Sequence, residues 1–296
     1  TFNLGSGANG EVHDIAVDSL GRIIVVGEFG AFDGIARANI ARLNPDGSLD
    51  GTFNPGFGAD GDINSVSVQA DDRVVIGGRF LLFDGVQVPG VARLQLDGSL
   101  DRSFAEALPR VDIASSWVNR VEVLEDGRIL VAGSFAATHD ADGNVLTYRG
   151  VLRLKRDGSV DTTFQPDAAI ALADREYGPN GDIRALGIQP DGSIIVGGTF
   201  TQFHGKTHNR VVRLTPDGEL DTTINFGSGA DGTILDAVVQ NDFRIILAGQ
   251  FEEFDGELRL RLARVYGGFN YDDGTIRFAE TSFIVNENRE ADTILL

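Results

Sequence analysis

The chain has 296 residues with 44 acidic and 25 basic side chains, so its formal net charge is −19 at pH 7. This acidity argues against nucleic-acid partners and against anionic membranes, because their phosphates attract a basic surface. There is no cysteine, which excludes disulfides and thiol chemistry. No apolar run approaches the ~20 residues of a membrane-spanning helix, and no signal peptide is recognisable. We expect a piece of a longer polypeptide, since the chain contains no methionine and ends within a strand-like run.

One phrase recurs along the chain. Residues 40–53 read IARLNPDGSLDGTF, and the phrase returns at 91–104, 151–164 and 211–224, while a fifth copy begins at Leu262 and breaks off. The arginines of successive copies are 51, 60, 60 and 51 residues apart, at positions 42, 93, 153, 213 and 264. A fixed period of this length indicates one supersecondary unit copied in tandem.

The recurring phrase has the pattern of a β-hairpin. Asn44-Pro45-Asp46-Gly47 predicts a type I turn with a glycine bulge, because proline suits the first central position and glycine tolerates a left-handed backbone. The register then pairs Arg42 with Asp50. We interpret this pair as a device that sets the register, contributing about 0.2–1 kcal/mol, and not as a functional site.

Each repeat contains four predicted strands, which in the first repeat cover residues 12–17, 22–29, 39–44 and 48–53. The second strand is apolar on both faces, which favours burial between two layers. Four strands joined by short turns form an antiparallel meander, and such sheets arranged radially make a β-propeller. The fold class is therefore all-β, a five-bladed β-propeller of four-stranded blades.

The ends of the chain suggest how the ring closes. The fifth repeat lacks its fourth strand, while Thr1-Phe2-Asn3 matches the end of that strand at Thr52-Phe53-Asn54. We therefore expect the N-terminal strand to complete the last blade and close the ring, which removes exposed sheet edges.

These phrases also resemble a known family. Residues 32–34, 41–50 and 188–200 are similar to the delta-60 repeat, a bacterial β-propeller-type repeat of large proteins predicted to be extracellular, and the resemblance covers residues 1–270. The family has no assigned activity, so it implies no catalytic residues. Residues 274–296 resemble the opening of a Calx-β domain, a type that often binds calcium and occurs in surface proteins and adhesins.

The domain prediction follows from the repeats and from this resemblance. Residues 1–273 form the propeller and residues 274–296 form the first strands of the Calx-β-like domain. The propeller repeats cover approximately residues 10–53, 61–104, 117–164, 181–224 and 232–270 together with 1–3.

Three insertions depart from the repeat length, at residues 105–116, 136–149 and 165–180. All lie in connections that a meander places on one rim, so they should form a long-loop face, and loops on a rigid scaffold commonly carry binding sites. Aromatic side chains among carboxylates and an arginine suit a sugar or a protein partner. The candidate ligand-binding residues are Trp117, Tyr148, Tyr177, Arg110, Asp174 and Glu176.

One further segment has the spacing of a metal site. Asp140, Asp142 and Asn144 match the first half of a calcium loop, but Val151 stands where a bidentate glutamate belongs. An ordinary hairpin tip is the favoured interpretation, and a calcium site is the alternative. We expect no other cofactor.

The leading functional hypothesis is a non-catalytic, extracellular scaffold or interaction module of a large bacterial surface protein, adhesin-like or fibre-forming. Its partners would be neighbouring domains of the same chain or other copies of it. A glycan-binding propeller that uses the long-loop face is the alternative. A glycoside hydrolase is a third, and it would need two carboxylates ~5–9.5 Å apart in a central cleft.

Overall fold

The computed structural model describes residues 2–3, 5–88, 90–111, 117–139, 142, 145–164 and 178–267. The all-β prediction is confirmed, because five antiparallel sheets, here called blades 1 to 5, follow one another along the chain. The single helix of these residues is α1, Arg102–Ala107. No helix of the described residues is long and apolar enough to cross a membrane.

Three strands recur in every blade in the order inner, middle and outer. The inner strands are β1 (Glu11–Val17), β6 (Ile63–Val68), β12 (Trp117–Val123), β15 (Ile183–Ile188) and β20 (Ile234–Val239). The middle strands are β2 (Ile23–Glu28), β7 (Val74–Gly78), β13 (Ile129–His139), β16 (Ile194–Gly198) and β21 (Arg244–Gly249). The outer strands are β5 (Ile40–Leu43), β10 (Val91–Leu94), β14 (Val145–Leu154), β19 (Val211–Leu214) and β24 (Leu262–Tyr266).

Short ribbons decorate the connections between the middle and outer strands. In four blades this connection contains a small hairpin in which each strand has two residues. The strand pairs are β3 (Ala31–Phe32) with β4 (Ile35–Ala36), β8 (Leu82–Phe83) with β9 (Val86–Gln87), β17 (Gln202–Phe203) with β18 (Lys206–Thr207), and β22 (Glu253–Phe254) with β23 (Glu257–Leu258). In blade 3, β13 and β14 are themselves elongated, and β11 (Arg110–Val111) pairs with the far end of β13.

The recurring hairpin forms in the predicted register. Asn44 N donates to Ser48 O at 2.8 Å, and Gly47 adopts a φ of 88°, as a type I turn with a glycine bulge requires. The expected fourth strand, however, is reduced to a single bridge between Leu43 and Leu49. The carboxylate of Asp50 accepts hydrogen bonds from the backbone and hydroxyl of Thr52, and this local turn replaces further strand pairing.

The recurring arginine does more than set the register. Arg42 pairs with Asp50 as predicted, with Nε 2.8 Å from Oδ2, but both side chains are buried. The same guanidinium donates to the backbone oxygen of Leu96 in the next blade, at 2.7 Å, and lies over the ring of Phe53. The burial of the pair and the bond to Leu96 add a second role to the setting of the register, which is to join two blades.

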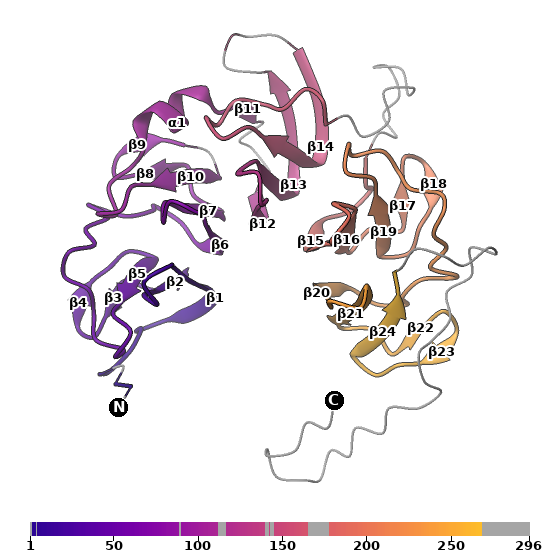
Figure 1. Cartoon of the computed structure of the whole chain (residues 1–296), viewed down its shortest axis with the longest axis horizontal. Coiled ribbons are helices and arrows are strands. Elements are labelled where there is room, and N and C mark those ends of the chain that lie inside the picture. The colour runs from indigo at the N-terminus through magenta and orange to yellow at the C-terminus, as the bar shows by residue number, and fades with distance from the viewer. Residues whose placement is uncertain are drawn as a thin grey trace.

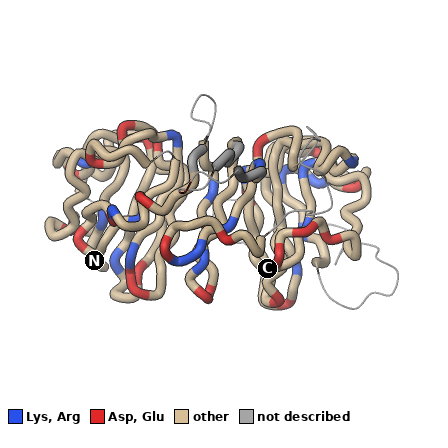
Figure 2. Tube along the Cα trace, turned by 90° about the horizontal axis from the view of Figure 1, so that it is seen from above, with Lys and Arg blue, Asp and Glu red and all other residues tan. Residues whose placement is uncertain are grey.

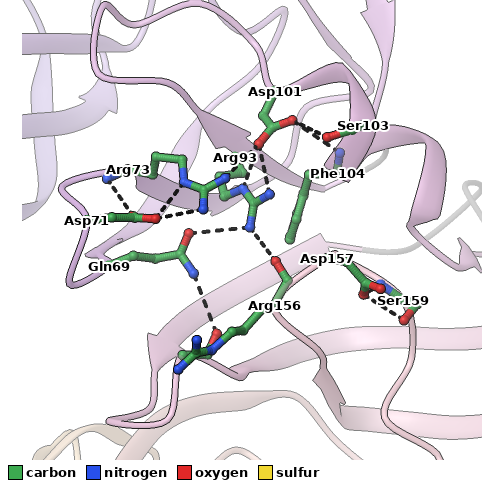
Figure 3. Close-up of polar contacts among 11 residues, drawn as sticks. Gln69, Asp71, Arg73, Arg93, Asp101, Ser103, Phe104, Arg156, Asp157 and Ser159 are labelled. Carbon is green, nitrogen blue, oxygen red and sulfur yellow. Dashed lines mark hydrogen bonds and ion pairs between the residues drawn. The ribbon is translucent and has the colours of Figure 1, made fainter.

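The same interblade contact recurs at the next three junctions. Figure 3 shows Arg93 paired with Asp101 while donating to the backbone oxygen of Arg156 in blade 3. Arg153 reaches Pro216 O at 2.6 Å, and Arg213 reaches Gly267 O at 2.7 Å. Each buried arginine thus links the outer edge of its own blade to the segment that follows the outer strand of the next blade.

The blades form an arc around a common centre, with the inner strands nearest to it (Figure 1). The expected ring closure is not seen in the described residues, because blade 1 and blade 5 lie on opposite sides of an opening. Residues 2–3 lie beside blade 1, where Asn3 N donates to Asp46 O at 2.8 Å, while β24 lies across the opening (Figure 1). Acidic residues are spread along the loops of both rims (Figure 2).

Candidate functional site

Charged side chains from separate blades meet at the inner strands. The guanidinium of Arg120, in β12, lies 3.0 Å from the carboxylate of Asp236 in β20 and 3.9 Å from that of Asp14 in β1. Its Nε donates to the backbone oxygen of Arg184, in β15, at 3.1 Å. We name Asp14, Arg120, Glu122 and Asp236 the axial cluster. It connects blades 1, 3, 4 and 5.

The backbone explains why these side chains converge. Every inner strand contains a β-bulge close to its start, for example between Val12 and Asp14 or between Val118 and Arg120. Bulges bend a strand and redirect its side chains, and they are frequent beside active sites. The residues immediately after the bulges are Asp14, Ser65, Arg120, Ala185 and Asp236.

These positions differ between repeats, whereas the scaffold positions recur. The middle strands are apolar in every copy, and the outer strands keep the arginine. At the position after the bulge, in contrast, blades 1 to 5 carry an acidic, a hydroxyl, a basic, a methyl and an acidic side chain, in that order. Alignment of the five repeats with one another could have revealed this cluster. We missed it in the sequence because we looked for binding residues in the insertions instead.

Glu122 has an unusual electrostatic environment. It stands two residues after Arg120 on β12, so both side chains lie on the same face. The side chain reaches solvent, but surrounding protein atoms bury it partly, and this burial together with the Asp14 carboxylate raises the pKa of Glu122. The nearby Arg120 lowers the pKa by less. A carboxyl group with a raised pKa can hold a proton for donation to a ligand.

The raised pKa predicts a pH-dependent effect of Glu122→Gln. When the pKa of a carboxyl group is higher in the folded state than in the unfolded state, the protein loses stability as pH rises from the unfolded pKa to the folded pKa. For Glu122 this pH range begins near 4.5. The glutamine variant lacks this penalty, so its melting temperature should exceed that of the parent at pH 7 but not at pH 4. Thermal unfolding by circular dichroism at both pH values measures this. An equal difference at both values would contradict the raised pKa.

The predicted ligand-binding residues are only partly described. Trp117 opens β12, is half-buried and lies under the guanidinium of Arg79 at 4.8 Å. Tyr148, in β14, is packed into the core with 7% exposure. Arg110 lies in β11, whose backbone pairs with His139. Tyr177, Asp174 and Glu176 lie outside the described residues, so a site on the long-loop face stays a prediction.

The predicted calcium site and the C-terminal domain also remain predictions. Asp142 lies in an exposed turn, while Asp140 and Asn144 are outside the described residues. The Calx-β-like residues 274–296 are likewise outside them. Among described side chains, Glu11, His13 and Glu28 could offer metal ligands within 4.8 Å of one another. All three are solvent-exposed or nearly so, and exposed acidic groups commonly gather without an ion.

A hollow lies between blades 4 and 5. It has a volume of about 160 Å³ and is lined by the β18 hairpin and by the loop that leads into blade 5, including His208, Asn209, Asn225 and Ser228. Burial lowers the pKa of His208, with a smaller contribution from Lys206. The hollow contains fewer charged groups than the axial cluster, so we regard it as a secondary candidate.

The comparisons with known proteins support the fold. Residues 21–53, 69–104, 124–164 and 189–223 match the family model described as "Domain of unknown function (DUF5122) beta-propeller". These four segments therefore match a β-propeller repeat family, as the resemblance to the delta-60 repeat implied. No curated protein sequence matches the chain.

Solved structures of similar fold include proteins described as enzymes and an extracellular domain. Virginiamycin B lyase from Staphylococcus aureus shares 13% identity over 92% of this chain and 71% of its own, with a TM-score of 0.52. A Thermus thermophilus protein described as an oxidoreductase (glucose dehydrogenase) shares 15% identity over 93% of this chain and 84% of its own, with a TM-score of 0.52. The extracellular domain of a B. thetaiotaomicron one-component system shares 13% identity, with a TM-score of 0.50, and this chain spans only 29% of that protein.

These neighbours correct one expectation. We inferred from regular repetition that the chain is not an enzyme, and that inference was wrong. Two of the similar structures belong to proteins described as enzymes, so a regular propeller scaffold does not exclude catalysis. At 13–15% identity the likeness shows the fold alone, and it does not show a reaction for this chain.

Proposed function

We propose that the chain is a β-propeller interaction module of an extracellular bacterial surface protein, and that it binds a polar ligand at the axial cluster. The observation that carries this proposal is the meeting of Asp14, Arg120 and Asp236 from three blades at one guanidinium. Sites built on strands hold side chains more precisely than sites on loops. The extracellular location rests on the resemblance to the delta-60 repeat, and the similar fold of an extracellular domain supports it.

The charges of the axial cluster select the ligand class. Two aspartates already neutralise Arg120, so an anionic ligand would meet excess negative charge. Carboxylates accept hydrogen bonds, while a guanidinium donates them. A neutral ligand rich in hydroxyl groups satisfies both kinds of partner. We therefore propose a glycan as the ligand and a role in surface adhesion.

A glycan array with the purified chain tests this proposal. The parent should bind at least one neutral glycan, and Asp236→Asn should weaken that binding, because it removes a charge that orients Arg120. Arg102→Gln is the matched control, since Arg102 is exposed on α1, away from the inner strands. Arrays run with calcium and with chelator test the separate calcium prediction. Binding that Asp236→Asn leaves unchanged would contradict the axial location.

The long-loop face is a second candidate location for the same function. The described observation in its favour is the length of the blade 3 hairpin, with 11 residues in β13 against 5 or 6 in the other middle strands. This hairpin extends beyond its neighbours (Figure 1). If Tyr177→Ala abolishes glycan binding while Asp236→Asn does not, the ligand lies on the long-loop face.

Catalysis at the axial cluster is a second candidate function. The raised pKa of Glu122 favours it, because a carboxyl group whose pKa is raised by burial can act as a general acid. Incubation of the chain with each glycan that it binds, followed by mass spectrometry of the products, tests for turnover. Glu122→Gln should abolish any turnover while leaving binding measurable, and turnover that survives this change would exclude Glu122 as the acid.

A further inference from the structure

The two ends of the arc expose apolar surfaces that neighbouring blades cover elsewhere. In blade 1, Val12 is 48% exposed and Ile15 is 60% exposed. Their repeat equivalents in blade 2, Ile63 and Val66, are 0% and 6% exposed. Ile63 and Val66 share a core cluster with Ile24, Val26 and Ile40 of blade 1, so the preceding blade covers them. Among described residues, nothing covers this face in blade 1.

Blade 5 exposes the face that a following blade covers elsewhere in the structure. Leu262 opens its outer strand and is 46% exposed. The residues at the same position of the other four blades are at most 6% exposed, and they are Ile40, Val91, Val151 and Val211. Ile40 packs against blade 2 and Val211 against blade 5, so this position contacts the following blade. The face at Leu262 is therefore the complement of the face at Ile15.

Residues 2–3 contact blade 1 in the way that the end of one blade contacts the next blade. Asn3 N donates to Asp46 O of blade 1, and Asn54 N, at the end of blade 1, donates in the same way to Asp97 O of blade 2. Phe53 is fully buried beneath the guanidinium of its own blade, whereas its equivalent Phe2 is 53% exposed. Phe2 and Asn3 thus occupy the position that belongs to the end of a preceding blade.

We propose that one additional blade of the same repeat type packs between blade 5 and blade 1 and covers both faces, with Phe2 and Asn3 at the end of its outermost segment. The interface would repeat the four interfaces already present. Asp236 fits this arrangement, because the equivalent Asp14 accepts a hydrogen bond from Val66 N of the following blade at 3.0 Å. The inner strand of the added blade would present that amide to Asp236.

The shape of the arc favours a single blade over a second whole copy. Successive blades turn about a common centre, and the arc already surrounds most of it (Figure 1). A second copy docked on blade 5 in the same geometry would place its own second blade where blade 1 lies. A single blade satisfies both faces without this overlap.

The test compares Ile15→Lys in two chains. One is the chain itself, and the other carries a copy of residues 181–222 placed before Thr1, which restores the repeat phrase through Phe2. In the chain itself Ile15 is exposed, so the melting temperature should not change. In the extended chain Ile15 is expected to be buried, so the lysine should lower the melting temperature by about 5–10 °C. Phe57→Lys is the control for both chains, since Phe57 is 86% exposed.

Three results would overturn the proposal. A large loss of melting temperature from Ile15→Lys in the chain itself would mean that its own blades already cover this face. Concentration-dependent dimers in analytical ultracentrifugation, dissolved by Ile15→Lys, would identify a second copy as the occupant. An added repeat that proteases remove without lowering the melting temperature, or that never folds, would show that the opening does not accept a blade. The first two experiments use the unextended chain and do not depend on the folding of the extended one.

Discussion

Replacing Arg42 with methionine is expected to destabilise the protein by about 3–5 kcal/mol, because the change leaves a buried carboxylate without its cation. The side chain of Asp50 is 7% exposed, and Arg42 is its partner at 2.8 Å. The hydrogen bond to Leu96 O and the contact with the Phe53 ring are lost as well. Methionine has a similar length, so the cavity contribution is small and the electrostatic cost dominates.

Urea denaturation followed by circular dichroism measures the effect of Arg42→Met. Arg102→Met is the matched control, because Arg102 is exposed on α1 and should change stability by less than about 0.5 kcal/mol. The double variant Arg42→Met with Asp50→Leu should recover part of the loss, since it removes the orphaned charge. A loss below about 1 kcal/mol for the single variant would instead match an exposed cross-strand pair.

Replacing Gly158 with alanine is expected to cost about 3 kcal/mol or more, since backbone strain and an interblade clash combine. Gly158 has a φ of 97°, which disfavours any other residue. A Cβ at this position would lie 2.7 Å from the backbone oxygen of Phe104 and 2.9 Å from its ring. Phe104 lies at the end of blade 2, so the absence of a side chain at Gly158 allows blade 2 to pack closely against the turn of blade 3.

Gly85→Ala separates the two contributions to this cost. Gly85 has a φ of 75°, but a Cβ added there would meet no other atom within 4 Å, so only the backbone contribution of about 1–2 kcal/mol applies. Urea midpoints of both variants measure the difference. Equal losses for Gly85→Ala and Gly158→Ala would mean that the blade 2 and blade 3 junction relaxes around the added methyl group.

The repeats predicted most of the architecture because local rules decide it. The Asn-Pro-Asp-Gly turn, the pairing of Arg42 with Asp50 and the apolar middle strands all depend on residues close in sequence, and each is confirmed. The fourth strand was predicted from alternation alone. The Asp50 side chain stops it by hydrogen bonding to Thr52, a competition that period-2 alternation does not reveal.

The role of the arginine and the axial cluster could not be obtained from spacing. Alternation placed Arg42 on a polar face, but the contact with Leu96 depends on how two blades stack. Arg120 and Asp236 are 116 residues apart and meet only because the arc brings blades 3 and 5 to one centre. The insertions are visible in the sequence because they change the repeat length. The charged residues of the inner strands do not change it, so spacing alone does not reveal them.

The most direct test of the axial cluster is isothermal titration calorimetry of the parent and Asp236→Asn with the strongest ligand from the glycan array. The axial location predicts that Asp236→Asn weakens binding at least tenfold, a loss of about 1.4 kcal/mol, while Tyr177→Ala leaves it unchanged. Equal affinities for the parent and Asp236→Asn would contradict it and would move the binding site away from the inner strands.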